Sequence, residues 1–210
     1  MCRKRQVLPL AGLAALLVAL SSPALAQHPV DTLQNRAKAA GGTLLWRYRP
    51  NNSSLYANIE ELSKRTDVIV VGRTVMHRST LRPDGKFITE DFQVIVQEVI
   101  KGDLSTGKVI TVSLPGGIYK FPDGTLANVL PRGYKKPEDH TTYVFFLKNK
   151  GAIYQGHQLA SETQGLFALK DGKVEPADLV RDHPVVMKYK GMGIANFLGE
   201  IHKAVPLKKK

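Results

Sequence analysis

The fold class is indicated most clearly by the run Asp67-Val68-Ile69-Val70-Val71-Gly72-Arg73-Thr74-Val75-Met76, followed by Arg82-Pro83-Asp84-Gly85-Lys86 and then by Phe87 to Ile100. The first run is rich in β-branched residues and has no apolar stripe at helical spacing, which predicts a strand. Asp-Gly readily adopts the positive φ angles of a tight turn, so the chain is expected to double back as a hairpin. The segment from Val109 to Leu114 is then expected to form a third strand of the same meander.

The return strand is too long to stay straight. Fourteen extended residues from Phe87 to Ile100 would span about 45 Å at roughly 3.3 Å each. That length exceeds the width of about 30 Å of a small domain. The strand is therefore expected to coil, bulge or break, and coiled strands are typical of small barrels.

Further strands are predicted at residues 141–147, 153–159, 165–169 and 173–175, separated by hairpin-length turns. Such spacing favours antiparallel pairing over alternating strands and helices. Between the two groups, residues 118–140 contain three prolines and two glycines. This segment is interpreted as a long loop with at most a short hairpin around Asp123-Gly124, and long loops in compact domains are often functional.

Helices are expected at both ends of the strand region. Residues 27–42 form either a short helix or irregular chain. A helix is expected to begin in the cap-rich cluster at residues 51–54, with its apolar stripe on Leu55, Ile59 and Leu62. One clear C-terminal helix is indicated by an apolar stripe with a period of 3.6 residues, formed by Ile194, Phe197, Leu198 and Ile201. The predicted fold is mainly β, a small antiparallel OB-like barrel with an N-terminal and a C-terminal helix.

The N-terminus has the three-part layout of a secretory signal peptide. A basic stretch, Arg3-Lys4-Arg5, precedes an apolar run and the small-residue site Ala24-Leu25-Ala26, so cleavage is expected after Ala26. The expected organisation is a signal peptide (1–26), an N-terminal extension (27–54), an antiparallel β-barrel domain (55–176) and a C-terminal helical extension with a basic tail (177–210). The mature chain is expected to be periplasmic or secreted and to contain no transmembrane segment.

Composition restricts the chemistry of this mature chain. Cys2 is the only cysteine and leaves with the leader, so disulfides, thiolate metal sites and a cysteine nucleophile are excluded from the mature chain. The mature chain keeps 27 basic residues against 18 acidic ones, a formal charge of +9. A basic exported protein is attracted to anionic partners such as envelope polysaccharides, lipid headgroups or acidic proteins.

The order of these motifs resembles a loosely defined group of exported bacterial proteins with no assigned activity, similar in outline to the OB-fold/TIMP-like (netrin-type) barrel. The resemblance covers roughly residues 55–205. It implies fold only, because the animal inhibitors of that type use an N-terminal cysteine and disulfides that this chain lacks. The segments that carry it are Asp67-Val68-Ile69-Val70-Val71-Gly72-Arg73, Val96-Gln97-Glu98-Val99-Ile100-Lys101-Gly102, Pro115-Gly116-Gly117, Tyr143-Val144-Phe145-Phe146-Leu147 and Asn196-Phe197-Leu198-Gly199-Glu200-Ile201.

No catalytic or metal-binding motif is found in the chain. The histidines are not paired at i,i+2 or i,i+4, and no Gly-x-Ser-x-Gly run marks a serine nucleophile. A triad of Asp139, His140 and Ser161 would depend on chance folding, and Glu90 and Asp91 are expected on opposite faces of a strand. No catalytic residue, metal ligand or cofactor is therefore predicted.

The preferred hypothesis is a non-catalytic exported binding or structural module of the cell envelope. Its partner would be an anionic envelope component or another exported protein. The alternatives are an envelope hydrolase with an unrecognised site, or a nucleic-acid-binding barrel that stacks bases on Tyr143 and Phe145, which export disfavours. The candidate binding residues are Arg132, Tyr134, Lys135, Lys136, Lys208, Lys209 and Lys210.

Overall fold

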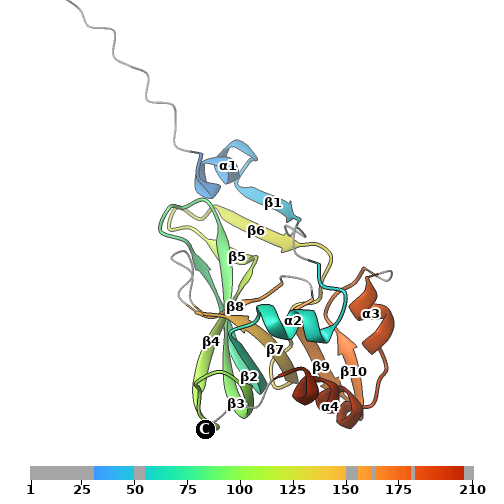
Figure 1. The fold of residues 1–210 in the computed structure, drawn as a ribbon. Helices are drawn as coiled ribbons and strands as arrows, with labels where there is room; N and C mark the ends of the chain where they lie inside the picture. Colours follow the sequence, from blue (N-terminus) through green and yellow to red (C-terminus); the bar gives the residue numbers. More distant parts are fainter. Residues whose placement is uncertain (1–30, 50–54, 150–155, 162–163, 181–182, 206–210) are drawn as a thin grey trace, which may run out of the picture.

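The computed structural model describes residues 31–49, 55–149, 156–161, 164–180 and 183–205. Within these residues the chain forms two β-sheets with helices near both ends, so the predicted mainly-β class is confirmed (Figure 1). The larger sheet has the order β10-β9-β7-β2-β3-β4 with β8 on β7, and the smaller one has the order β1-β6-β5. No helix of the described part is long and apolar enough to span a bilayer.

The elements have the following bounds. The larger sheet contains β2 (Val68–Leu81), β3 (Ile88–Lys101), β4 (Val109–Pro115), β7 (Thr142–Lys148), β8 (Gln158–Leu159), β9 (Leu166–Lys170) and β10 (Lys173–Pro176). The smaller sheet contains β1 (Thr43–Tyr48), β5 (Gly117–Lys120) and β6 (Leu126–Pro131). The helices are α1 (Leu33–Ala39), α2 (Ile59–Arg65), α3 (Pro184–Tyr189) and α4 (Ile194–Ala204).

The β2–β3 hairpin is formed by the two longest strands of the described chain. Its turn is closed by a 2.9 Å hydrogen bond from the Arg82 N–H to the Phe87 carbonyl, and Gly85 has a φ of 65°, as the Asp-Gly signal predicts. The register between the two strands shifts at three places, after Ile69, Val71 and Thr74. The expected bulging of a 14-residue strand is thereby confirmed.

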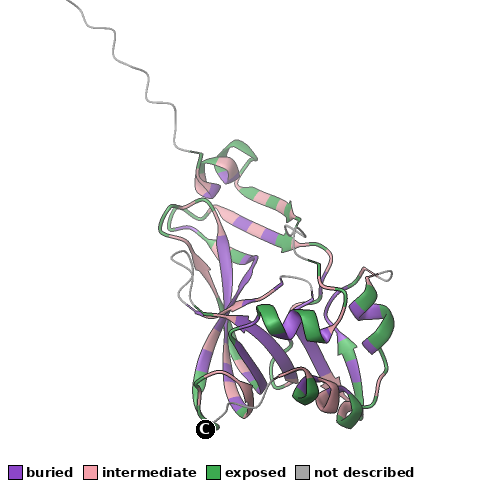
Figure 2. Cartoon of the chain, in the orientation of Figure 1, coloured by how far each residue is buried: buried purple, intermediate pink, exposed green. Residues whose placement is uncertain are grey.

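The start of β2 is buried on both faces of the larger sheet, which explains its uninterrupted apolar run (Figure 2). Ile69 and Val71 face α2, α3 and α4, whose inward side chains include Leu62, Tyr189 and Phe197. The opposite face holds a second core that joins side chains of β2, β3, β4, β7 and β9. Because β4 at one end of the order and β9 near the other end meet in this second core, the sheet curls around it.

The strand pairing of the larger sheet nevertheless does not close into a continuous ring among the described strands. Among the described strands, the order ends at β10 on one side and β4 on the other. A single parallel bridge connects Val112 of β4 with His157, which lies just before β8. The expected closed barrel is thus not seen as continuous strand pairing.

The smaller sheet corrects the interpretation of residues 118–140 as a long loop. The hairpin around Asp123-Gly124 is flanked by β5 and β6, and only residues 132–141 remain irregular. β6 also pairs in parallel with β1, from Thr43↔Leu126 to Tyr48↔Pro131. The predicted N-terminal extension thus supplies a strand, β1. Among the named strands of the described chain, β1 and β6 form the only parallel pair.

The helices differ from expectation at two points. α2 begins at Ile59 rather than within residues 51–54, which lie outside the described residues, because the Asn58 side chain caps it by accepting from the Glu61 N–H. Leu55 therefore lies outside the helix and is exposed. α3 was not predicted, whereas α4 carries the expected stripe with Phe197 and Ile201 fully buried.

Candidate functional site

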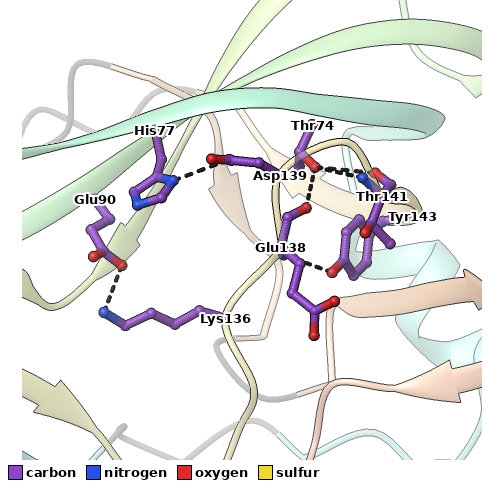
Figure 3. Close-up of polar contacts among 8 residues, drawn as sticks. All are labelled: Thr74, His77, Glu90, Lys136, Glu138, Asp139, Thr141 and Tyr143. Atoms are coloured by element: carbon purple, nitrogen blue, oxygen red, sulfur yellow. Dashed lines mark hydrogen bonds and ion pairs between the residues drawn. The ribbon is translucent and has the colours of Figure 1, made fainter.

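The segment between β6 and β7, residues 132–141, is named the β6–β7 loop. Its backbone is held against the larger sheet at both ends. The Lys135 N–H donates to the Ala177 carbonyl at 2.7 Å, and the His140 N–H donates to the Thr74 carbonyl at 2.8 Å. The Thr74 hydroxyl donates to the Glu138 carbonyl at 2.5 Å, so the middle of the loop is fixed as well (Figure 3).

The predicted binding residues of this loop have different environments. Arg132 and Lys135 are exposed, and Lys136 is half-buried. Tyr134 is only 4% exposed, and its hydroxyl donates to the Pro115 carbonyl at 3.2 Å, so this side chain belongs to the core. The tail lysines 208–210 and the cleavage residue Ala26 lie outside the described residues.

Lys135 and Lys136 meet at a pocket of about 130 Å³ between the loop and the strands β7, β9 and β10. Three lysines and two glutamates surround it, together with a tyrosine and small apolar residues. The lining residues are Lys135, Lys136, Glu138, Tyr143, Ala168, Lys170, Glu175, Pro176 and Ala177. The sequence predicts two of these lysines as binding residues but carries no signal for Lys170, because only the folded sheet brings the end of β9 beside the loop.

Lys170 forms an ion pair with Glu138, with 2.6 Å between Nζ and Oε2. The hydrogen bond with Lys170 lowers the pKa of Glu138, and the same bond raises the pKa of Lys170. Both groups therefore carry their charges at neutral pH. The side chains of Lys170 and Glu138 are 40% and 64% exposed, respectively, so solvent screens the pair strongly.

Lys136 reaches in the other direction, to Glu90 of β3, with 2.6 Å between Nζ and Oε2. The Glu90 side chain is 9% exposed, so this carboxylate needs the ammonium as its counter-charge. The neighbouring Asp91 accepts the hydroxyl hydrogens of Thr80 and Ser113 at 2.8 and 2.6 Å. The predicted placement of Glu90 and Asp91 on opposite faces of the strand agrees with these separate partners.

Tyr143 forms the buried wall of the pocket. Its hydroxyl accepts a 2.8 Å hydrogen bond from the Glu138 N–H. Burial raises the pKa of this phenol, so it stays protonated at neutral pH and serves as a neutral anchor for the loop. Phe145 is also fully buried, so neither of the two aromatic side chains proposed for base stacking is available to a nucleic acid.

On the far side of the loop, His77 Nδ1 lies 3.0 Å from Asp139 Oδ1. The imidazole stacks on the buried Phe92 with 5.2 Å between ring centroids, and its side chain is 44% exposed. Asp139 thus pairs with His77 rather than with its neighbour His140, while the Ser161 hydroxyl accepts from the Gln164 N–H. No sequence signal marks the pair of His77 and Asp139, because 62 positions separate its members.

The described residues contain no group of three or more His, Cys, Asp or Glu side chains placed to hold a metal ion. The site thus combines a small lysine-lined pocket with an exposed histidine–aspartate pair across one loop. The chain matches no protein-family model, and comparison with curated proteins finds no significant match.

Proposed function

We propose that the protein is an exported, non-catalytic binding module of the cell envelope that holds an anionic group of its partner in the pocket beside the β6–β7 loop. The observation that carries the proposal is that three lysines, Lys135, Lys136 and Lys170, line one pocket. Ammonium groups form charge-assisted hydrogen bonds with carboxylate or phosphate oxygens, which are stronger than neutral ones. The Lys135 side chain forms no ion pair within the described chain, so it is available to a ligand.

The size of the pocket indicates how much of a partner it holds. Pockets that enclose a whole small molecule usually measure about 300–1,000 Å³. At about 130 Å³, this one holds a single charged group or one end of a larger molecule. A polymer that carries repeated acidic groups, such as an acidic polysaccharide, fits this geometry and the predicted export.

The OB-like barrel is the architecture that we propose for this module. Its support is the main-chain contact between β4 and the segment before β8, where the Ser113 N–H donates to the His157 carbonyl at 2.9 Å and the His157 N–H donates to the Thr111 carbonyl at 2.8 Å. β8 itself pairs with β7. A ring of strands β2, β3, β4, β8 and β7 around the second core would result, and small barrels fill their interiors with side chains in this way.

Binding of oligogalacturonate by isothermal titration calorimetry tests the function. The wild-type protein is expected to bind this polyuronate with an affinity that falls as salt rises, and not to bind neutral dextran. The double variant K135Q/K170Q should lose roughly tenfold in affinity, since a lysine near an anionic surface contributes about 1 kcal/mol before screening.

The matched control is K108Q/K120Q, which removes two exposed lysines, one in the turn before β4 and one in β5. Equal losses in the two double variants would show a general charge effect and contradict a local site. Absence of wild-type binding to polyuronate, phosphate and anionic vesicles alike would contradict the proposal as a whole.

A second candidate function is hydrolysis, because His77 and Asp139 form a pair that orients an exposed imidazole. An esterase, peptidase and glycosidase screen tests it. Activity that is abolished by H77Q, and retained by H202Q at the analogous exposed pair with Glu98, would favour catalysis at this site. A negative screen, or activity that survives H77Q, would remove it.

A further inference from the structure

Glu138 occupies an unusual position for a residue that lines a lysine-rich pocket. Its carboxylate already holds Lys170 Nζ at 2.6 Å, so one of the pocket lysines has an anionic partner in the absence of any ligand. The other acidic lining residue, Glu175, forms no ion pair with any described residue. The two glutamates thus have the same charge but different contacts.

The contacts that fix the loop here belong to the backbone of Glu138, not to its carboxylate. The Glu138 carbonyl accepts from the Thr74 hydroxyl, and its N–H donates to the Tyr143 hydroxyl. Figure 3 shows the carboxylate directed away from both of these contacts. Rotation of the side chain can therefore release Lys170 while the loop keeps its conformation.

We propose that the Glu138 carboxylate is an internal stand-in for a ligand carboxylate, and that a uronate-type ligand displaces it from Lys170 on binding. This inference rests on the proposed function and specifies the ligand and the regulation of the same site. Displacement of Glu138 from Lys170 costs little free energy, because an exposed ion pair contributes little to stability.

The charges around the pocket match a single negative charge on the ligand. Once Glu138 has rotated away, the remaining charged groups are three lysines, Glu175, and Glu90, which holds Lys136. One positive charge is then uncompensated. A carboxylate neutralises it, whereas a phosphate dianion would leave an excess negative charge in the pocket.

The test compares E138Q with E175Q, since both remove one negative charge from the lining and only E138Q frees Lys170. The probes are trigalacturonate and inorganic phosphate, titrated by calorimetry at fixed ionic strength. E138Q is expected to bind trigalacturonate about three- to fivefold more tightly than E175Q does, because the competing ion pair is gone. K170Q should bind it more weakly than the wild type.

Equal affinities of E138Q and E175Q, with binding retained by the wild type, would overturn the displacement and leave the proposed function standing. Phosphate bound as tightly as trigalacturonate, with the same response to E138Q, would overturn the carboxylate assignment. Failure of all variants to bind either probe would count against the proposed function itself. If E138Q fails to fold by circular dichroism, E138A and E175A provide the same comparison.

Discussion

Gly117 shows how one residue position can hold the two sheets together. It begins β5 with a φ of 125°, and a Cβ there would lie 2.5 Å from the Ser79 hydroxyl oxygen and 2.9 Å from Glu90 Cγ. The Ser79 hydroxyl in turn accepts the Ile118 N–H at 3.0 Å. A side chain at this position would push the smaller sheet away from the β2–β3 hairpin and disturb the buried Glu90 that holds Lys136.

The variant Gly117→Ala is therefore expected to lower the free energy of unfolding by about 2–4 kcal/mol, from backbone strain together with steric overlap. Urea denaturation followed by circular dichroism measures this change. Gly107→Ala is the matched control, because Gly107 also has a positive φ but a Cβ there would meet no atom within 4 Å. The control should cost only about 1–2 kcal/mol, and equal losses would contradict the close packing at Gly117.

Turn conformations that depend on single residues could be predicted from the sequence. The Asp-Gly pairs at 84–85 and 171–172 form the predicted turns, because positive φ is a property of the residues themselves. The pairs His77–Asp139 and Lys170–Glu138 could not be predicted from the sequence. Each depends on the register between segments distant in the chain, which no spacing in the sequence expresses.

At the scale of elements, a substitution in the segment before β8 tests the proposed barrel. A Cβ at Gly156 would lie 2.5 Å from the Thr111 carbonyl oxygen and 3.0 Å from the Ser113 hydroxyl oxygen. Gly156→Ala should therefore destabilise the protein by about 2–4 kcal/mol if this segment packs on β4. Gly199→Ala, in α4 and free of neighbours within 4 Å, should instead stabilise it by about 0.5–1 kcal/mol. An unchanged unfolding midpoint for Gly156→Ala would contradict the contact between β4 and the segment before β8.

The helices α3 and α4 are joined by Glu200, which accepts from Lys188 Nζ at 2.8 Å and from the Tyr189 hydroxyl at 3.1 Å. The hydrogen bond with Lys188 lowers the pKa of Glu200 below the ordinary value of 4.5. Stability from this group is present above pH 4.5 and is lost as pH falls through the lowered pKa of the folded state. The variant E200Q should thus lose stability less steeply than the wild type as the pH falls below about 4.5. Identical slopes in acid urea denaturation would show that the contact is not maintained in solution.

Element type was predictable where a pattern was long or strongly periodic, as for β2, β3 and α4. The strands β5 and β6 were mistaken for loop, because Pro122, Gly124 and Pro131 interrupt their apolar pattern. What stabilises these short strands is the pairing of β6 with β1, which lies far earlier in the chain. The helix α3 was missed because its six residues are too few to show a period.

At the scale of the whole molecule, β2 and β3 belong to the larger sheet, and the tip of their hairpin extends into the core of the smaller sheet. Ile88, Leu81 and Phe87 at the tip of the hairpin pack in the same core as Trp46 of the smaller sheet. The two sheets are therefore expected to unfold together. Trp46 is the only tryptophan, so its fluorescence reports the smaller sheet, while far-ultraviolet circular dichroism reports both. The two urea transitions should coincide, and an earlier transition in fluorescence would show that the smaller sheet unfolds independently.

The central claim is that the pocket beside the β6–β7 loop binds an anionic group. A titration of the ¹⁵N-labelled protein with oligogalacturonate, followed by amide chemical shifts, tests it most directly. We expect saturable shifts concentrated at residues 135–143, 168–170 and 175–177, which surround the pocket. Shifts confined to other surfaces, such as the open groove of about 610 Å³ beside α2 and α4, would contradict it.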